Sequence, residues 1–188
     1  ITKIGAYAFH NCSLLSSIKI PNSVKQINAG AFYKCTGLNW IEIGNGVSYI
    51  GKDVFSECNS LENIYVFNSN QYFSAVDGIL FNKEESKIIK YPASKEDSEY
   101  KISNTVTNIE DEAFSKANNL ENIEIHDNVT NIGQNAFSNC DNLTIKCYEG
   151  SYAHSYAVDN NIKYTLLPFT TVTGVKLNKT SITLEKGK

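Results

Sequence analysis

A 23-residue period is the feature that most constrains how this chain can fold. The pattern Ile-Gly-x-x-Ala-Phe-x-x-Cys-x-x-Leu-x-x-Ile-x-Ile begins at Ile4, returns at Ile27 and Ile50, and resumes at Ile109 and Ile132. A unit this short cannot bury its own apolar face and must stack on its neighbours. The period therefore predicts a solenoid in which equivalent side chains form continuous columns, and whose function lies on its outer surface.

Each unit predicts a short strand, then a corner, then a turn. Apolar residues alternate in the Leu-x-x-Ile-x-Ile segment, as in residues 17–20 and 40–43, which is typical of a strand with one face turned inward. A second apolar pair, such as Val24 and Ile27, follows and turns the corner. The Ala-Phe step, with Cys three residues after Phe, predicts a short helix or 3₁₀ segment on the opposite face. Strands of successive coils are expected to stack in parallel.

One interruption breaks the period, because 59 residues separate Ile50 from Ile109. The extra segment, about residues 67–99, contains two apolar runs, 79–81 and 87–92, joined by polar residues, which predicts an inserted β-hairpin. Alternatively, residues 89–92 repeat the pattern of 18–21 and take their own position in the sheet.

The C-terminal part of the repeat region has the features of a cap. Ser151 can act as a helix N-cap, and Tyr152 and Tyr156 lie four residues apart, on one helical face. A final short strand is expected at residues 162–164. A solenoid end needs such a closing unit because it would otherwise expose its core, so we expect a cap at about residues 150–165.

Composition and charge restrict the class of function. With 17 basic and 20 acidic residues, the net charge of −3 lacks the basic excess of a nucleic-acid binder. No apolar run approaches the ~20 residues needed to cross a bilayer, so no membrane insertion is predicted. The chain begins in mid-repeat and without Met, and we expect it to be part of a longer protein.

Four of the five cysteines occupy the same repeat position, and the intact repeat that lacks Cys has Ala117 there. A position that accepts Cys or Ala is small and apolar, so we predict unpaired core thiols and no disulfide. No metal site is expected, because the sequence has no Cys-x-x-Cys and no His paired to these positions. The four residues are Cys12, Cys35, Cys58 and Cys140.

With its repeat laid out as Leu-x-x-Ile-x-Ile-Pro-x-x-Val-x-x-Ile-Gly-x-x-Ala-Phe-x-x-Cys, the chain resembles the BspA-like, or Treponema-type, leucine-rich repeats over about residues 1–165. Residues 77–82 and 90–92 look like that family's recurrent inserted unit, and residues 152–158 look like its closing helix. A few residues depart from the pattern at small, turn or surface positions: Ala117, Gly44, His126, Asn28 and Glu110.

We therefore expect an α/β repeat solenoid over residues 1–167. It would be a right-handed leucine-rich-repeat superhelix with short parallel strands, one inserted β-hairpin unit and a C-terminal helical cap. Beyond it, the pattern Val175-x-Leu177-Asn178-x-Thr180 is similar to the opening strand of a bacterial immunoglobulin-like module, group 2. Residues 168–188 are accordingly expected to be a linker and the first strand of such a domain.

The resemblance implies a bacterial cell-surface or secreted protein. The described role of the family is adhesion, so the implied partners are host proteins or surface proteins of neighbouring cells. Two alternatives stay open at this point. The solenoid could be a structural spacer that presents other domains, or its surface could bind carbohydrate.

The strand pattern also gives a candidate binding surface. The only Trp falls on the same outward strand face as two aromatic residues of the next coil, with charged residues expected nearby. Exposed aromatic clusters are common in binding surfaces. The candidate residues are Trp40, Glu42, Tyr65, Phe67 and Lys101. Alternatively, these rings pack on one another or are covered by residues of the insertion, Tyr72 and Phe73.

Catalysis is not expected. The three histidines, His10, His126 and His154, fall far apart along the solenoid, and no nucleophile with a base and an orienting group is apparent. The chain has no G-x-S-x-G, H-E-x-x-H or phosphate-loop motif. We predict a protein that is not an enzyme and uses no cofactor.

Overall fold

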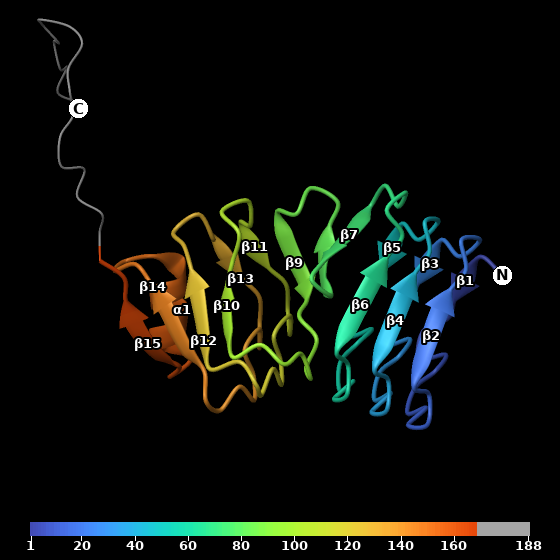
Figure 1. The fold of residues 1–188 in the computed structure, drawn as a ribbon, viewed down its shortest axis with the longest axis horizontal. Helices are drawn as coiled ribbons and strands as arrows, with labels where there is room; N and C mark the ends of the chain where they lie inside the picture. Colours follow the sequence, from blue (N-terminus) through green and yellow to red (C-terminus); the bar gives the residue numbers. More distant parts are fainter. Residues whose placement is uncertain (169–188) are drawn as a thin grey trace, which may run out of the picture.

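The computed structural model describes residues 1–168, so the predicted immunoglobulin-like strand lies outside the described residues. Its coils stack along one long axis, as Figure 1 shows. The first sheet, with order β2-β4-β6, is parallel and joins Ser17–Ile20, Trp40–Ile43 and Asn63–Val66. Its register places Ile18 opposite Ile41 and Ile41 opposite Ile64. The period thus predicts the pairing directly, since equivalent residues are partners.

The corner pairs form a second parallel sheet. It consists of β1 (Lys3–Ile4), β3 (Gln26–Ile27) and β5 (Tyr49–Ile50), in that order. Ile27 is fully buried, as expected for a residue that turns the chain around the core.

The third side of each coil differs from the sequence prediction. It contains successive turns and no short helix, since α1 is the one helix that the structure describes. The backbone N–H groups of alternate residues donate hydrogen bonds in different directions. In the first coil, the N–H of Ala8 donates to Gly5 O within the turn (3.3 Å), whereas that of Phe9 donates to Ala31 O of the next coil (2.8 Å). A helix would direct both bonds along its own axis, so stacking between coils replaces it.

The C-terminal coils repeat this arrangement. Their longer strands form a parallel sheet of β10 (Glu99–Lys101), β12 (Asn122–Ile125), β14 (Thr144–Cys147) and β15 (Lys163–Leu166). Their corner strands are β11 (Asn108–Ile109) and β13 (Asn131–Ile132), which also pair in parallel.

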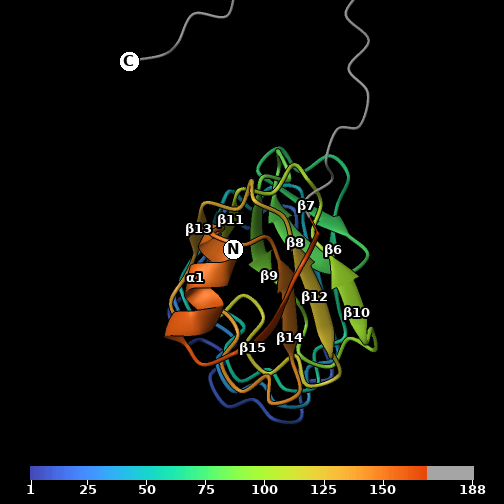
Figure 2. The ribbon, with the colours of Figure 1, turned by 90° about the vertical axis from the view of Figure 1, so that its left-hand side faces the viewer.

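The predicted cap is present. Helix α1 (Tyr152–Asp159) begins after Ser151, whose hydroxyl accepts a hydrogen bond from the N–H of His154. It turns Ala153 and Ala157 inward, and both are fully buried. Figure 2, viewed along the axis from this end, shows α1 lying across the last coil.

The insertion forms three antiparallel strands: β7 (Phe73–Val76), β8 (Ile79–Asn82) and β9 (Lys87–Lys90). The predicted hairpin, β8 with β9, is confirmed, while β7 was not predicted. The alternative, in which residues 89–92 take a position equivalent to 18–21, is wrong. Strand β9 instead pairs in parallel with the corner strand β11, where Lys87 lies opposite Asn108.

The predicted continuous column of repeat phenylalanines is interrupted once. Phe9, Phe32 and Phe55 stack in the first half, with ring centroids 5.1 and 6.3 Å apart. A second column begins with Tyr91, which takes the Phe position and stacks on Phe114 at 4.9 Å. The column is divided because the insertion replaces a regular coil at this point.

Two hydrophobic cores correspond to these two columns. Strand β8 separates them, since its successive side chains point to opposite sides. Leu80 contributes to the N-terminal core, whereas Ile79 and Phe81 contribute to the C-terminal core. The insertion is therefore a wall shared by two stacks of coils.

All five cysteines are free in the structure. Of the four thiols expected in the core, Cys35 and Cys58 are buried, Cys140 is half-buried, and Cys12 is exposed, so the expectation is wrong for Cys12. Three of the thiols have a polar role as well. The Sγ atoms of Cys35, Cys58 and Cys140 donate to the carbonyl of the repeat aromatic residue one coil earlier, at 3.0–3.1 Å. The sequence predicted only a small apolar site at this repeat position, and the structure shows that the thiol also forms a hydrogen bond there.

Candidate recognition surface

The outward residues of the first sheet form the candidate site. Because successive side chains of a strand point to opposite faces, the buried Ile41 and Ile43 leave Trp40 and Glu42 outward. Register places Glu42 beside Tyr65. The rings of Trp40 and Tyr65 meet edge to face, with centroids 6.2 Å apart. Sequence reasoning had placed these three residues on one face, and the structure brings them together.

Two of the rings are open to solvent. Tyr65 is 48% exposed and Phe67 is 43% exposed, while Trp40 is half-buried beneath its neighbours. Phe67 directly follows β6, and its N–H donates to Ile43 O at 3.0 Å. The rings of Tyr72 and Phe73 make no ring contact with this cluster among the described residues. Of the two packing alternatives, contact between Trp40 and Tyr65 is therefore present, and no ring of the insertion stacks on the cluster among the described residues.

A lysine that was not among the predicted site residues completes the cluster. Lys19 lies opposite Glu42 and forms an ion pair with it at 3.2 Å. Its ammonium also lies 5.9 Å from the centre of the Trp40 ring, within range of a cation–π contact. The 23-residue spacing between Lys19 and Glu42 could have revealed this pair. We call Lys19, Trp40, Glu42, Tyr65 and Phe67 the aromatic patch.

Lys101 does not belong to the aromatic patch, and its predicted proximity is wrong. It lies in β10, which belongs to the C-terminal sheet, whereas β6 is the last strand of the first sheet. There it pairs with Glu124 at 2.7 Å, and this hydrogen bond raises the pKa of Lys101. The insertion lies between β6 and β10 along the chain, so equivalent repeat positions are not neighbours there.

The outward face of the C-terminal sheet is polar by comparison. Its outward residues in the three paired strands form charge pairs or carry amide and hydroxyl groups: Glu99, Lys101, Asn122, Glu124, Thr144 and Lys146. The exposed rings of the aromatic patch are thus confined to one of the two strand faces.

The three histidines lie in separate coils, and each has a local partner. His10 stacks on Tyr33 at 5.5 Å, and His154 accepts a hydrogen bond from the N–H of Gly150 at 3.1 Å. His126 is buried where other repeats have proline. Its Nδ1 accepts from the N–H of Asn128, which leaves Nε2 to donate to Ser103 O at 2.7 Å.

No group of three metal-binding side chains is present in the part of the chain that the structure describes. Over the same residues, no helix has the length and apolarity that a membrane span requires.

Stacked coils with short parallel strands, turns on the other sides and a terminal cap define this protein as a leucine-rich-repeat solenoid. A family model described as the BspA type leucine rich repeat region matches residues 2–95 and 93–157, in six copies. The chain therefore belongs to the BspA-type leucine-rich-repeat family, whose members are typically non-catalytic binding modules.

Solved structures agree with this assignment. A leucine rich cell surface protein of Faecalibacterium prausnitzii A2-165 is 28% identical, with a TM-score of 0.63 over 77% of this chain and 50% of that chain. A leucine-rich repeat protein from Eubacterium ventriosum ATCC 27560 is 22% identical, with a TM-score of 0.57 over 79% of this chain and 58% of its own. The pneumococcal vaccine antigen PcpA is 21% identical, with a TM-score of 0.50 over 78% and 58%.

The last two similarities show the fold alone. This chain spans 50–58% of the length of these structures. No curated protein matches the sequence.

Proposed function

We propose that this solenoid is a non-catalytic protein-recognition module of a bacterial cell-surface or secreted protein, and that it binds a surface protein of a host or of a neighbouring cell. The similar Faecalibacterium protein is described as a cell surface protein, which supports the location. We propose residues 1–167 as the repeat domain, followed by the start of an immunoglobulin-like module.

The observation that carries the binding role is the exposure of Tyr65 and Phe67 on a strand face. Aromatic side chains bury a large area with little loss of conformational entropy and dominate many protein interfaces. Burying them between a partner and the first sheet would remove apolar surface from water, which is favourable. The outward residues of β10, β12 and β14 in the C-terminal sheet are polar and offer no comparable anchor.

The contacts around Trp40 favour a protein partner over a carbohydrate. Sugars commonly stack on an open aromatic face, whereas the Trp40 ring has Lys19 over it and Tyr65 against it. Protein interfaces instead combine aromatic anchors with a charged rim, and the Lys19–Glu42 pair would supply that rim.

A binding assay tests this proposal. The chain would be applied to immobilised matrix proteins (fibronectin, laminin and collagen) and to whole bacterial cells, in parallel with the double variant Tyr65→Ala/Phe67→Ala. We expect binding to at least one of these surfaces, and a loss of at least about tenfold in affinity for the variant. The matched control is Tyr152→Ala, because that ring is 45% exposed but lies on the cap helix.

Two results would contradict the proposal. Equal binding by the double variant and the control would show that the aromatic patch does not contribute to binding. The second result is that the unaltered chain binds none of these surfaces. If the solenoid then only extends the reach of a neighbouring domain, the spacer function is supported instead.

A further inference from the structure

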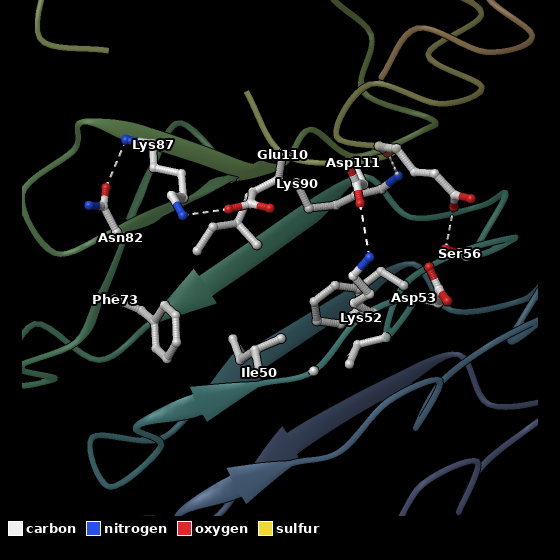
Figure 3. A pocket seen from close by; sticks show the side chains of 15 residues that line it. Ile50, Lys52, Asp53, Ser56, Phe73, Asn82, Lys87, Lys90, Glu110 and Asp111 are labelled. Carbon is white, nitrogen blue, oxygen red and sulfur yellow. Dashed lines mark hydrogen bonds and ion pairs between the residues drawn. The ribbon is translucent and has the colours of Figure 1, made fainter. Parts of the chain in front are cut away.

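A groove of about 350 Å³ lies between the two stacks of coils, on the side of the corner strands and turns. One wall is the coil that contains β5, and the other is formed by β9 and the segment after β11 (Figure 3). Strand β5 pairs with β3 alone, so its edge toward the groove has no neighbouring strand. The groove therefore occupies the place that a regular coil would take. Its volume is within the range of ligand sites.

The wall on the β5 side has unpaired backbone donors. In the preceding coil, the N–H groups of Gly30, Phe32 and Lys34 donate to carbonyls of the next coil, at 2.9–3.1 Å. The equivalent groups in the groove wall belong to Asp53, Phe55 and Glu57. Among residues 1–168 none of these three N–H groups has an acceptor within hydrogen-bonding distance.

The opposite wall has unpaired acceptors. In a regular coil, the carbonyls of Lys52 and Ser56 each accept from the preceding coil. Their counterparts 59 residues later are Asp111 and Ser115, and within the described residues no donor reaches either carbonyl. The two walls thus present free donors on one side and two free acceptors on the other. The carbonyl between these two acceptors, Ala113 O, is already taken by the N–H of Tyr91 at 2.8 Å, so backbone addition is open chiefly on the β5 side.

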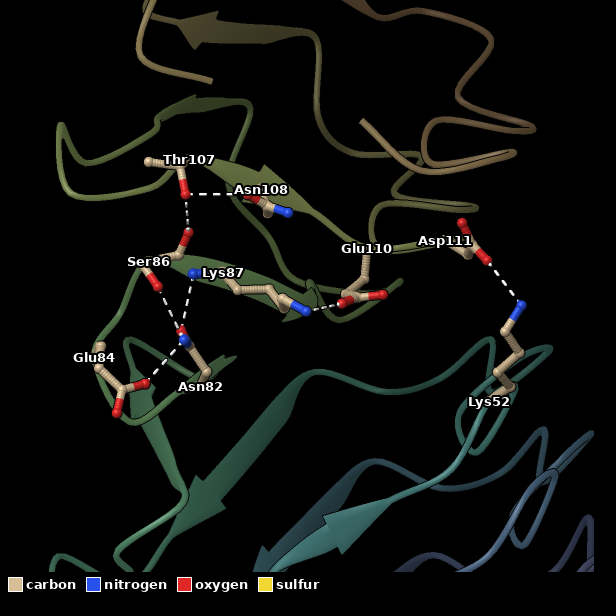
Figure 4. Close-up of polar contacts among 9 residues, drawn as sticks. All are labelled: Lys52, Asn82, Glu84, Ser86, Lys87, Thr107, Asn108, Glu110 and Asp111. Carbon is tan, nitrogen blue, oxygen red and sulfur yellow. Dashed lines mark hydrogen bonds and ion pairs between the residues drawn. The ribbon is translucent and has the colours of Figure 1, made fainter. Parts of the chain in front are cut away.

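Side chains bridge the mouth of the groove in place of a coil. Lys52 pairs with Asp111 at 3.1 Å, Lys116 pairs with Glu57, and the hydroxyl of Ser56 donates to a carboxylate oxygen of Glu112. Figure 4 shows the Lys52–Asp111 pair beside the Lys87–Glu110 pair, which lies within one wall. The Lys52 side chain is 80% exposed and that of Asp111 is 44% exposed, so their contact is screened by solvent and weak. The Lys52–Asp111 bridge can therefore open at little cost, whereas the Lys116–Glu57 and Ser56–Glu112 contacts are partly buried.

The floor of the groove is apolar. It is lined by side chains from both stacks and from the insertion: Ile50, Val54, Phe55, Phe73 and Ile89. An occupant would need at least one apolar side chain to cover them. Once the Lys52–Asp111 bridge opens, the occupant would face the ammonium of Lys52 on one wall and the carboxylates of Glu110 and Asp111 on the other. Its charges would therefore be mixed.

We propose that this groove binds an extended segment of another polypeptide, by backbone addition to the edge of the β5 coil. The carbonyls of the segment accept from the N–H groups of Asp53, Phe55 and Glu57. An apolar side chain lies on the floor, and neighbouring acidic and basic side chains pair with Lys52 and with Asp111. Backbone addition at an open edge gives affinity, while the side-chain positions give specificity. This site is separate from the aromatic patch.

The chain supplies a suitable probe. Residues 49–57, with the sequence YIGKDVFSE, fill the equivalent position against the preceding coil and carry adjacent Lys and Asp. A synthetic peptide of this sequence, with blocked ends and a fluorophore, would be titrated with the full chain and followed by fluorescence polarisation. We expect saturable binding, and affinity at least about tenfold lower for a scrambled peptide of the same composition.

A pair of variants locates the binding. Ile89→Asp places a charge on the apolar floor, and we expect it to weaken binding by at least about tenfold. Val76→Asp is the matched control, because Val76 also lies in the insertion but is 46% exposed and does not line the groove. It should bind as the unaltered chain does. Thermal unfolding of both variants would show whether each is folded.

Amide hydrogen exchange provides a test that needs no variant. Without peptide, the amides of Asp53, Phe55 and Glu57 should exchange at least about tenfold faster than those of Gly30, Phe32 and Lys34. With saturating peptide, these three amides should become protected.

Five results would overturn the proposal. Four of them are slow exchange of the three amides without peptide, equal binding of the scrambled peptide, equal binding by Ile89→Asp, and protection by peptide only at another edge such as β6. Protection that rises with protein concentration in the absence of peptide would also overturn it, since a second copy of the chain would then be the occupant.

Discussion

Single residues in this solenoid reveal where the regular repeat is broken. Lys90 is the clearest case, since its side chain is buried at the junction between the two stacks of coils. Its ammonium donates to Glu112 O at 2.9 Å. Burial lowers the pKa of Lys90 to about 8, although Glu112 opposes the shift. A buried ammonium with a single carbonyl acceptor costs stability, so its titration should be measurable.

The sign of the effect follows from the lowered pKa. Between pH 8 and the ordinary lysine pKa of 10.5, the unfolded chain binds more protons at this position than the folded chain. The contribution of Lys90 to the free energy of unfolding therefore rises with pH across that window, and its penalty is fully present below pH 8.

We predict that Lys90→Met is more stable than the unaltered chain at pH 7, by about 1–2 kcal/mol. Because methionine carries no charge, the difference between the two proteins should shrink as the pH rises from 8 to 10.5. Urea unfolding at several pH values measures this difference. Lys25→Met, at an exposed position, is the control and should show no such trend. A constant difference across the window would refute the assignment.

The thiol of Cys58 gives a second prediction at this scale. Burial raises the pKa of Cys58 to about 12, so the thiol stays protonated and keeps its hydrogen bond to Phe32 O. Cys58→Ala removes both this bond and the sulfur volume, and should lower the free energy of unfolding by about 1–2 kcal/mol. Cys12→Ala, at an exposed thiol, should change it little. Similar losses for both variants would mean that the repeat thiols do not act through packing between coils.

At the scale of elements, the sequence predicts the strands well, because residues separated by one repeat period are also neighbours in space. Residues 23 apart in regular coils are neighbours, and the alternation of Ile with polar residues states which face is buried. The same reasoning placed Trp40, Glu42 and Tyr65 on one surface. The cap was predictable because Ser151 and the two alanines of α1 follow general helix rules.

The failures share a physical cause. A Phe-x-x-Cys spacing fits a helical turn, but the N–H of Phe9 bonds to the next coil, and a local pattern cannot reveal that bond. Lys101 was assigned to the wrong neighbourhood because counting repeats across the insertion assumes an unbroken sheet. Strand β7 and the groove were missed for a related reason, since both arise where a coil is replaced.

Close stacking of the coils gives a prediction for the repeat glycine. A Cβ at Gly51 would lie 2.5 Å from the backbone N of Ala29, whereas a Cβ at Gly5 would have nothing within 4 Å. Both glycines occupy the same repeat position, so they are a matched pair. We expect Gly51→Ala to cost about 1–3 kcal/mol of stability. Gly5→Ala should change stability by less than about 0.5 kcal/mol, which thermal unfolding can verify. Equal effects would show that backbone conformation, and not the spacing of coils, requires glycine here.

At the scale of the whole molecule, the protein consists of two stacks of coils that share one wall. Each stack has its own core and its own column of aromatic rings. Contacts within a stack are regular backbone ladders. Between the stacks, on the side of the groove, there is no such ladder among the described residues, and side-chain bridges such as Lys52–Asp111 join the coils. A backbone bond, from the N–H of Ser94 to Leu61 O, links the segment after β9 to the N-terminal stack. The interior thus has a structural role, while the aromatic patch and the groove are the surfaces that we propose for partners.

This division predicts how the solenoid unfolds. Repeat proteins behave approximately as a sum of units and interfaces, so a weak interface separates cooperative blocks. The interface between Phe55 and Tyr91 lacks the ring stacking that joins all other neighbouring coils of the repeat. We therefore expect two blocks, with the insertion as the boundary.

The most direct test is residue-resolved amide hydrogen exchange of the native chain in increasing, sub-denaturing urea. The account predicts that buried amides separate into two groups, one before and one after the insertion, each with its own opening free energy and urea dependence. A single group, in which Phe32 and Phe114 exchange through the same opening, would contradict it.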